Sequence, residues 1–206
     1  MKISILLPYK ENYSPTYPGA VSLFIHSTMK LSNYKKKILV YGSTDLKEKF
    51  SDNYINISLS PNSVFRSQSK EYVEKFMHLH KDHNVDIIEI HNRPNYVNLI
   101  EKLKTKVVLY FHNDPLTMVG SKTKRERIHL LDICSKIIFN SVWSKKRFLE
   151  GLDTFYRKSI KLEVIHQSIN KKKIDINKKL KIITFVGKLN TAKGYDLFGK
   201  AIIKIL

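Results

Sequence analysis

Short apolar runs alternate along the chain with longer amphipathic stretches, and this alternation limits the folds that the chain can adopt. The run Val107-Val108-Leu109-Tyr110-Phe111 has no polar position that would face water, and strands buried on both faces have this composition. Strands that alternate with helical stretches are typical of a parallel sheet covered by helices. We therefore predict an α/β fold, a Rossmann-like parallel sheet with helices on both faces.

The pattern also predicts where the elements and domains lie. A strand, a glycine turn and one helix cannot bury a core alone, so residues 182–206 are expected to be the incomplete start of a second domain. Residues 1–169 would form the first domain, and the polar, lysine-rich residues 170–181 the linker. The expected strands are 2–7, 37–41, 54–59, 85–90, 106–111, 136–139, 162–165 and 182–186. The expected helices are 20–33, 68–80, 96–104, 123–133, 142–151 and 195–206.

Charge and cysteine content narrow the classes of protein. The net charge of +19 suits a nucleic-acid partner, an anionic membrane or a phosphate-bearing substrate. However, the lysines are spread along the chain and no nucleic-acid-binding motif is present, so we expect a largely solvated basic surface and no nucleic-acid partner. Cys134 is the single cysteine and lies in an apolar context, which predicts a buried thiol. No apolar run is long enough for a signal peptide or a membrane span, so we expect a cytoplasmic protein with at most peripheral contact at the inner face of the membrane.

Two neighbouring strands end in similar sequences. One gives His91-Asn92-Arg93-Pro94 and the other gives His112-Asn113-Asp114-Pro115. In an open parallel sheet, ligands bind beyond the carboxyl ends of the strands. Histidine and asparagine at that rim can bind a sugar-like polyol or a phosphate-bearing acceptor, or they can only cap the strands through turn hydrogen bonds.

Other candidate sites are weaker. Gly19 and Ala20 open the first helix, where backbone N–H groups can approach an anion, although a plain helix-start turn explains them equally well. His78, His80 and His83 are spaced so that they fall on different helix faces, so we expect no metal site. Thr123 and Glu126 have the spacing of a capping box, and the basic residues around them could touch anionic headgroups. Neither G-x-G-x-x-G nor a Walker motif is present, which disfavours a nicotinamide or ATP site.

Taken in order, the motifs resemble family-4-type glycosyltransferases of the GT-B fold. His91-Asn92-Arg93-Pro94 and His112-Asn113-Asp114-Pro115 are similar to the H-N-R-P and H-N-D-P stretches of bacterial members. The stretch 141–144 matches S-x-W-S/T, and 164–170 takes the place of V-I-P-N-G-I-D. The stretch 187–194 resembles G-R-L-x-x-x-K-G, with Lys188 where the family usually has arginine. Gly19-Ala20 stands where relatives have two glycines.

The resemblance implies a fold, a reaction and a set of site residues. The chain would be the N-terminal half of a GT-B fold plus the start of the nucleotide-sugar-binding domain. The enzyme would transfer a hexose, with retention, from a nucleoside diphosphate sugar to a saccharide or lipid-linked acceptor in polysaccharide biosynthesis, with neither a metal nor another cofactor. His112 takes the place of a histidine that borders the reacting sugar and is the candidate catalytic residue. The implied acceptor-binding residues are Gly19, Ala20, His91, Asn92, Arg93, Asn113 and Asp114; Lys188 and Lys193 would flank the donor diphosphate.

Three functional hypotheses follow. A paired-glutamate stretch that relatives carry later in the donor domain has no counterpart here, so we expect a truncated enzyme that is inactive alone. The second hypothesis is a split enzyme, in which a partner chain supplies the missing donor domain. The third, from a different class, is a basic nucleic-acid-binding protein.

Overall fold

The structure is a computed structural model that describes residues 1–59, 67–81, 83–168, 182–187, 189 and 191–205. The chain divides into two compact units, Met1–Ser168 and Ile169–Leu206. The expected linker 170–181 lies outside the described residues, as does Lys188.

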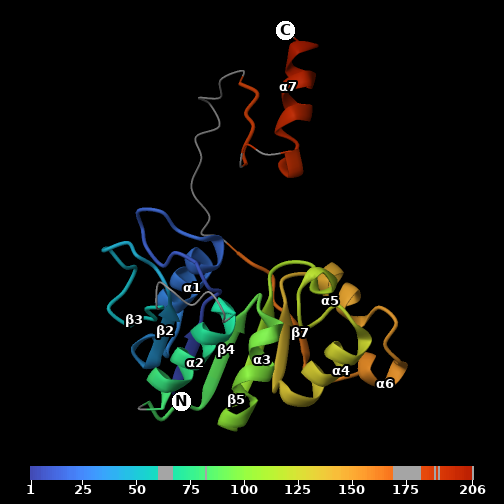
Figure 1. Ribbon diagram of the computed structural model, residues 1–206. Coiled ribbons are helices and arrows are strands. Elements are labelled where there is room, and N and C mark those ends of the chain that lie inside the picture. The colour runs from blue at the N-terminus through green and yellow to red at the C-terminus, as the bar shows by residue number, and fades with distance from the viewer. Residues whose placement is uncertain (60–66, 82, 169–181, 188, 190, 206) are drawn as a thin grey trace. The chain divides into compact units, whose positions relative to one another are not determined.

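The first unit is built on one sheet of seven parallel strands in the spatial order β3-β2-β1-β4-β5-β6-β7 (Figure 1). The chain builds outward from β1 in one direction and then continues in the other from β4, so the strand order reverses between β1 and β4. Ligands of open parallel sheets bind at such a switch point, beyond the carboxyl ends of the strands. The strands are β1 (Ile3–Leu6), β2 (Ile38–Gly42), β3 (Tyr54–Asn56), β4 (Ile87–His91), β5 (Lys106–Phe111), β6 (Lys136–Phe139) and β7 (Leu162–Val164).

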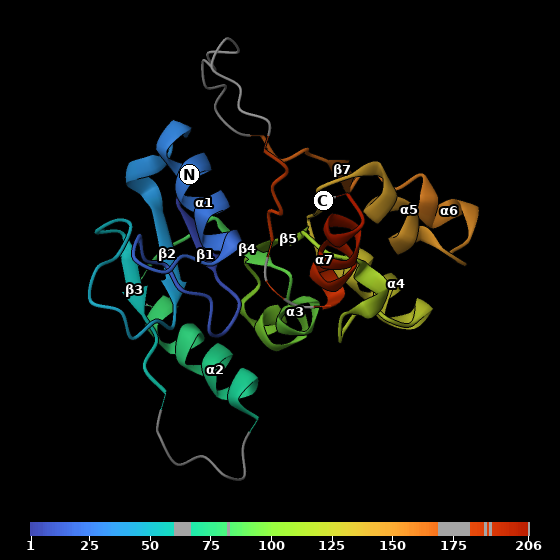
Figure 2. The same ribbon diagram turned by 90° about the horizontal axis from the view of Figure 1, so that it is seen from above.

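Helices connect the strands and cover both faces of the sheet. In Figure 2, α1 lies on one side of the strands and α2 and α3 lie on the other. The helices are α1 (Ala20–Leu31), α2 (Gln68–His80), α3 (Pro94–Ile100), α4 (Lys124–Ile133), α5 (Val142–Leu149), α6 (Thr154–Arg157) and α7 (Tyr195–Ile203), of which α7 belongs to the second unit. Short 3-10 turns are η1 (Lys35–Lys37), η2 (Glu101–Leu103), η3 (Pro115–Thr117) and η5 (Thr191–Lys193).

The alternation of side chains along β1 divides the core between the two faces. Leu6 belongs to the larger apolar cluster, with Phe76 of α2 and Leu130 of α4. Its neighbour Ile5 points the other way and packs with Ile25 of α1. The predicted fold class, a parallel sheet with helices on both faces, is confirmed.

Local sequence signals explain several boundaries. Helix α4 starts with the predicted capping box, in which the Thr123 hydroxyl accepts from the Glu126 N–H and the Glu126 carboxylate accepts from the Thr123 N–H. Helix α3 begins at Pro94, two residues before the expected start, because proline suits the first helical turn. Strand β3 stops at Asn56, short of the expected Leu59, and the four-residue helix α6 was not predicted.

The strand expected at 182–186 is a wrong prediction. These residues are described and carry no strand. A strand needs a neighbouring backbone to satisfy its N–H and C=O groups, and no described residue of the second unit pairs with this segment. The helix that follows, α7, ends at Ile203.

Burial confirms the sequence prediction for the single cysteine. Cys134 is a free, buried thiol whose pKa is raised to about 12 by burial. His80 is buried whereas His78 is exposed, and no metal-binding group of three ligands occurs among the residues described. In that same part of the chain, no helix combines the length and apolar character needed to cross a bilayer.

Candidate functional site

The two strand-end histidines lie in direct contact. The register pairs His91 of β4 with Tyr110 of β5, so His112 lies two residues further along, on the same face. His91 Nδ1 is 2.8 Å from His112 Nε2, and the rings of His91, Tyr110 and His112 stack. The prediction that both histidines share one rim of the sheet is therefore confirmed, while their roles stay predictions.

The histidine pair continues into a longer chain of polar groups. Glu89 precedes His91 by two residues, so both side chains point to the same face, and its Oε1 lies 2.6 Å from His91 Nε2. At the other end, Gln167 Nε2 lies 2.7 Å from His112 Nδ1. His91 is fully buried, whereas Glu89 is partly exposed and Gln167 is exposed, so these contacts connect a buried histidine to the surface through His112.

Two asparagines fix the backbone of His112. Asn92 adopts the left-handed conformation, with φ 53°, which asparagine tolerates better than most residues. In that conformation its Oδ1 accepts a 2.8 Å hydrogen bond from the His112 N–H. On the other side, Asn140 Nδ2 donates to the His112 carbonyl at 2.7 Å. Asn92 thus acts by positioning His112.

The surroundings keep His112 neutral. Burial, reinforced by the neighbouring His91, lowers the pKa of His112 to about 3. The Phe24 ring of α1 packs edge-on against His112, with centroids 5.2 Å apart. Burial and the Glu89 carboxylate raise the pKa of Tyr110 to about 12, so its hydroxyl stays protonated and bonds to the Ile165 carbonyl. At neutral pH this part of the site offers neutral hydrogen-bonding groups on stacked rings.

The remaining residues of the two motifs have different surroundings. Arg93 lies at the N-terminus of α3 and donates to the Asn92 carbonyl at 2.8 Å. Asp114 accepts from the Leu116 N–H and forms an ion pair with Arg147 of α5 at 3.1 Å. Asn113 is exposed. A structural role therefore accounts for Asp114, while the binding roles of Arg93 and Asn113 stay predictions.

The start of α1, predicted to receive an anion, already holds one. Glu11 Oε1 accepts a 3.0 Å hydrogen bond from the Ser22 N–H in the first turn of α1. A Cβ on Gly19 would overlap the Glu11 carboxylate, so glycine is needed here for close approach by the chain itself. Ala20 is exposed. An external phosphate at this helix start would have to displace Glu11.

Of the two lysines of the predicted diphosphate site, one lies among the described residues. Lys188 lies outside the described residues, whereas Lys193 is exposed at the end of η5 in the second unit. Their proposed role therefore remains a prediction from the sequence.

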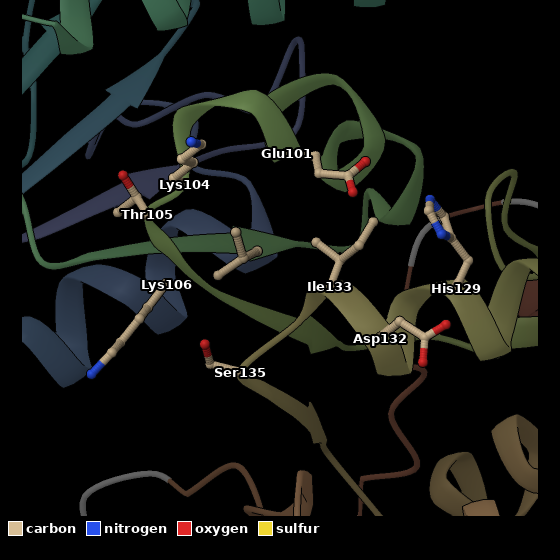
Figure 3. Close-up of a pocket in the computed structure, with 9 residues that line it drawn as sticks. Glu101, Lys104, Thr105, Lys106, His129, Asp132, Ile133 and Ser135 are labelled. Atoms are coloured by element: carbon tan, nitrogen blue, oxygen red, sulfur yellow. The ribbon is translucent and has the colours of Figure 1, made fainter.

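A separate surface hollow of about 410 Å³ lies at the opposite ends of the strands (Figure 3). Its lining comes from the end of α4, with His129 and Asp132, and from the start of β5, with Lys106. Since β5 runs from Lys106 to Phe111, the hollow lies about 17 Å along the strand from the histidine pair. It is not part of the candidate site.

Sequence reasoning missed Glu89, Gln167 and Glu11. Glu89 was detectable, because it is a carboxylate inside the apolar run Ile87–His91 and lies two residues before His91, so both side chains point to the same face of the sheet. Gln167 and Glu11 gave no comparable signal, because their contacts depend on how loops fold back on the sheet.

Comparison with solved structures places this site in a known fold. The chain is similar to Anabaena Alr3699/HepE, crystallised with UDP and glucose, at 18% identity and a TM-score of 0.56, over 82% of this chain and 45% of that one. It is similar to sucrose-phosphate synthase from Thermosynechococcus elongatus at 12% identity and TM-score 0.52, over 81% of this chain and 48% of that one. For a glycosyltransferase from Rickettsia africae ESF-5 the values are 14% and 0.52, over 82% and 44%.

These similarities define the fold class. The first unit has the Rossmann-like fold of one half of a GT-B glycosyltransferase. The chain spans about half the length of the solved structures that it matches. No family model and no curated protein matches the sequence.

Proposed function

We propose that the chain supplies the acceptor-binding half of a family-4-type, retaining glycosyltransferase. The complete enzyme would transfer a hexose from a nucleoside diphosphate sugar to a saccharide or lipid-linked acceptor in polysaccharide biosynthesis. One observation carries this proposal: the His91–His112 pair, held at the carboxyl rim of a sheet with the GT-B half-domain fold. In Anabaena HepE a protein of this fold was crystallised with UDP-glucose.

The chemistry of the rim suits a saccharide. His112 is neutral, partly exposed and rigidly held, so it can exchange hydrogen bonds with a hydroxyl group without the desolvation cost of a charged side chain. The rings of His91 and Tyr110 stack beneath it and are buried, so they support His112, and Arg93 and Asn113 add donors at the edge. In this proposal His112 contacts the reacting sugar, and Arg93, Asn113, Gly19 and Ala20 line or border the acceptor site. His91, which the sequence also assigns to this site, is fully buried and supports His112 instead.

Acceptor binding can be tested on the 206-residue chain. We expect saturation-transfer-difference NMR to detect binding of maltose, used as a neutral model acceptor, and His112→Ala to abolish it. His129→Ala is the matched control, because His129 borders the hollow at the opposite ends of the strands. Equal saccharide signals from the wild-type chain and the His112→Ala variant would contradict the proposal.

The exposed apolar face of helix α7 favours a donor side that is completed by further protein. Helix α7 has no buried residue among those described, and Leu197 and Ile203 are 66% and 79% exposed. An apolar face of this kind needs a partner surface. The donor side, with Lys188 and Lys193 near the diphosphate, would be completed in the same polypeptide or by a partner chain. Peripheral contact with an anionic membrane, at the inner face, would bring lipid-linked acceptors to the rim.

Catalysis by the isolated chain is a distinct test. We expect no hexose transfer from UDP-glucose by the purified 206-residue chain, because Lys193 is exposed and helix α7, which follows it, buries no described side chain. Turnover that disappears in the His112→Ala variant would show that the chain transfers sugar unaided.

A further inference from the structure

The chain of contacts Glu89–His91–His112–Gln167 determines where each proton lies. A carboxylate can only accept hydrogen bonds, so the 2.6 Å contact with Glu89 requires a proton on His91 Nε2. In a neutral imidazole the other nitrogen is then an acceptor. His91 Nδ1 therefore accepts, and His112 Nε2, at 2.8 Å, must carry the proton.

The same rule fixes the last nitrogen. With its proton on Nε2, neutral His112 presents a lone pair on Nδ1. The group that meets this lone pair is the Gln167 amide nitrogen, a donor, at 2.7 Å. The contacts of Glu89 and of Gln167 therefore require the same direction of hydrogen-bond donation, from Gln167 through both histidines to Glu89.

The opposite arrangement conflicts with the contacts. If His91 were a doubly protonated imidazolium, it would donate to Glu89 and to His112 Nε2. His112 would then carry its proton on Nδ1, and that N–H would face the Gln167 N–H at 2.7 Å. Two opposed donors repel each other, so the observed geometry favours the arrangement in which both histidines are neutral.

We propose that Glu89 and His91 are positioning residues that hold the Nδ1 lone pair of His112 toward the ligand side, so that His112 accepts a hydrogen bond from a substrate hydroxyl. Gln167 is exposed and occupies this place. A hydroxyl that displaces Gln167 donates in its stead. A carboxylate or a phosphodiester is ionised at neutral pH, offers only lone pairs and is disfavoured here. This inference rests on the proposed function for the identity of the ligand as a saccharide.

The protonation pattern can be read directly. Two-bond ¹H–¹⁵N correlation spectra of the ¹⁵N-labelled full chain distinguish the two tautomers of each histidine. At pH 7 and without ligand we expect His112 to favour the Nε2–H form by at least about tenfold, which corresponds to about 1.4 kcal/mol. His91 should show the same tautomer. A His112 protonated on Nδ1, or an imidazolium at His91, would overturn the inference.

A matched pair of variants tests the role of Glu89. Glu89→Gln keeps the shape of the side chain but can present either its amide oxygen or its amide N–H group to His91. The direction of the hydrogen bonds between these residues is then no longer fixed. Hydrogen bonds to ionised acceptors are stronger than neutral ones, and we expect the His112 tautomer ratio to fall by about tenfold. Glu163→Gln is the control, because Glu163 lies on β7 of the same sheet and pairs with Lys136 instead. An unchanged ratio in Glu89→Gln would refute the positioning role.

The binding of a hydroxyl group by His112 has its own test, with maltose and acetate as probes at pH 7, where acetate is fully ionised and can only accept hydrogen bonds. Maltose should shift the His112 Nδ1 resonance and leave the His91 tautomer unchanged, whereas acetate should shift neither. A shift of Nδ1 by acetate alone would overturn the claim about hydroxyl groups. A chain with the expected tautomers that binds no saccharide would reject the proposed function but leave the positioning inference intact. A saccharide-binding chain with Nδ1–H on His112 would do the reverse.

Discussion

The contact between Glu11 and the start of α1 makes a prediction about coupling between two positions. Glu11 Oε1 accepts from the Ser22 N–H, and the carboxylate occupies the space that a side chain on residue 19 would need. If both statements hold, Glu11→Ala and Gly19→Ala should damage the same interaction. The loss in the double variant should then resemble the loss in either single variant.

The magnitude follows from helix-capping energetics. Loss of a side-chain acceptor at a helix N-terminus costs about 1 kcal/mol, and loss of a negative charge from the positive end of the helix dipole costs about 0.5 kcal/mol more. Gly19 has φ −78°, which alanine adopts without strain, so Gly19→Ala should act only by expelling the carboxylate. Each variant, and the double variant, should therefore lose about 1.5 kcal/mol, or about 3–6 °C in Tm.

Urea unfolding followed by circular dichroism measures these differences. Glu11→Gln is the control, since it keeps an oxygen for the Ser22 N–H but removes the charge, and it should lose about 0.5 kcal/mol. A double variant that loses about 3 kcal/mol would show that the two substitutions are independent. That result, or a Gly19→Ala variant as stable as the wild type, would refute the assignment of Glu11 as the cap of α1.

Three further predictions concern the site and its support. Because the pKa of His112 is about 3 in the folded chain and near 6.5 when unfolded, stability should fall as pH drops through this window; by pH 5 the loss is about 2 kcal/mol, visible in urea unfolding and absent in His112→Gln. Phe148 is fully buried against Phe111, so Phe148→Ala should cost about 3–5 kcal/mol in the same assay, whereas Phe155→Ala, at an 83% exposed position, should cost little. Asp114→Asn should weaken the Arg147 ion pair and speed amide hydrogen exchange at Leu116 and Thr117 without changing the exchange of β5; unchanged exchange there would show that the ion pair does not hold this loop.

The sequence was sufficient to predict the sheet and the rim on which His91 and His112 lie. Strands such as β5 are apolar after their first residue, and polar residues and proline follow them, so both the fold class and the shared rim of His91 and His112 were predictable. The partners of these histidines were harder to predict. Gln167 reaches His112 across 55 residues of sequence, and such a contact depends on the path of the chain after β7, which no local pattern encodes.

The wrong prediction of a strand at 182–186 shows a limit of strand propensity as a predictor. Apolar residues such as Ile182 and Ile183 have high strand propensity, but propensity describes how well a side chain fits a sheet that already exists. No described residue of the second unit pairs with this segment, and both side chains are more than 60% exposed. The same kind of run inside the first unit, in β5, forms a strand because β4 and β6 flank it on both sides.

The two similar strand ends are assigned different tasks by the register of the sheet. Because His91 pairs with Tyr110, His112 lies two residues, or about 7 Å, further out along the rim. The inner His91 is fully buried between Glu89 and His112, so it can meet no ligand. The outer His112 retains one nitrogen at the surface, opposite the exposed Gln167. The same dipeptide therefore supplies a support for His112 in one strand and, under the proposed function, the group that contacts the ligand in the next.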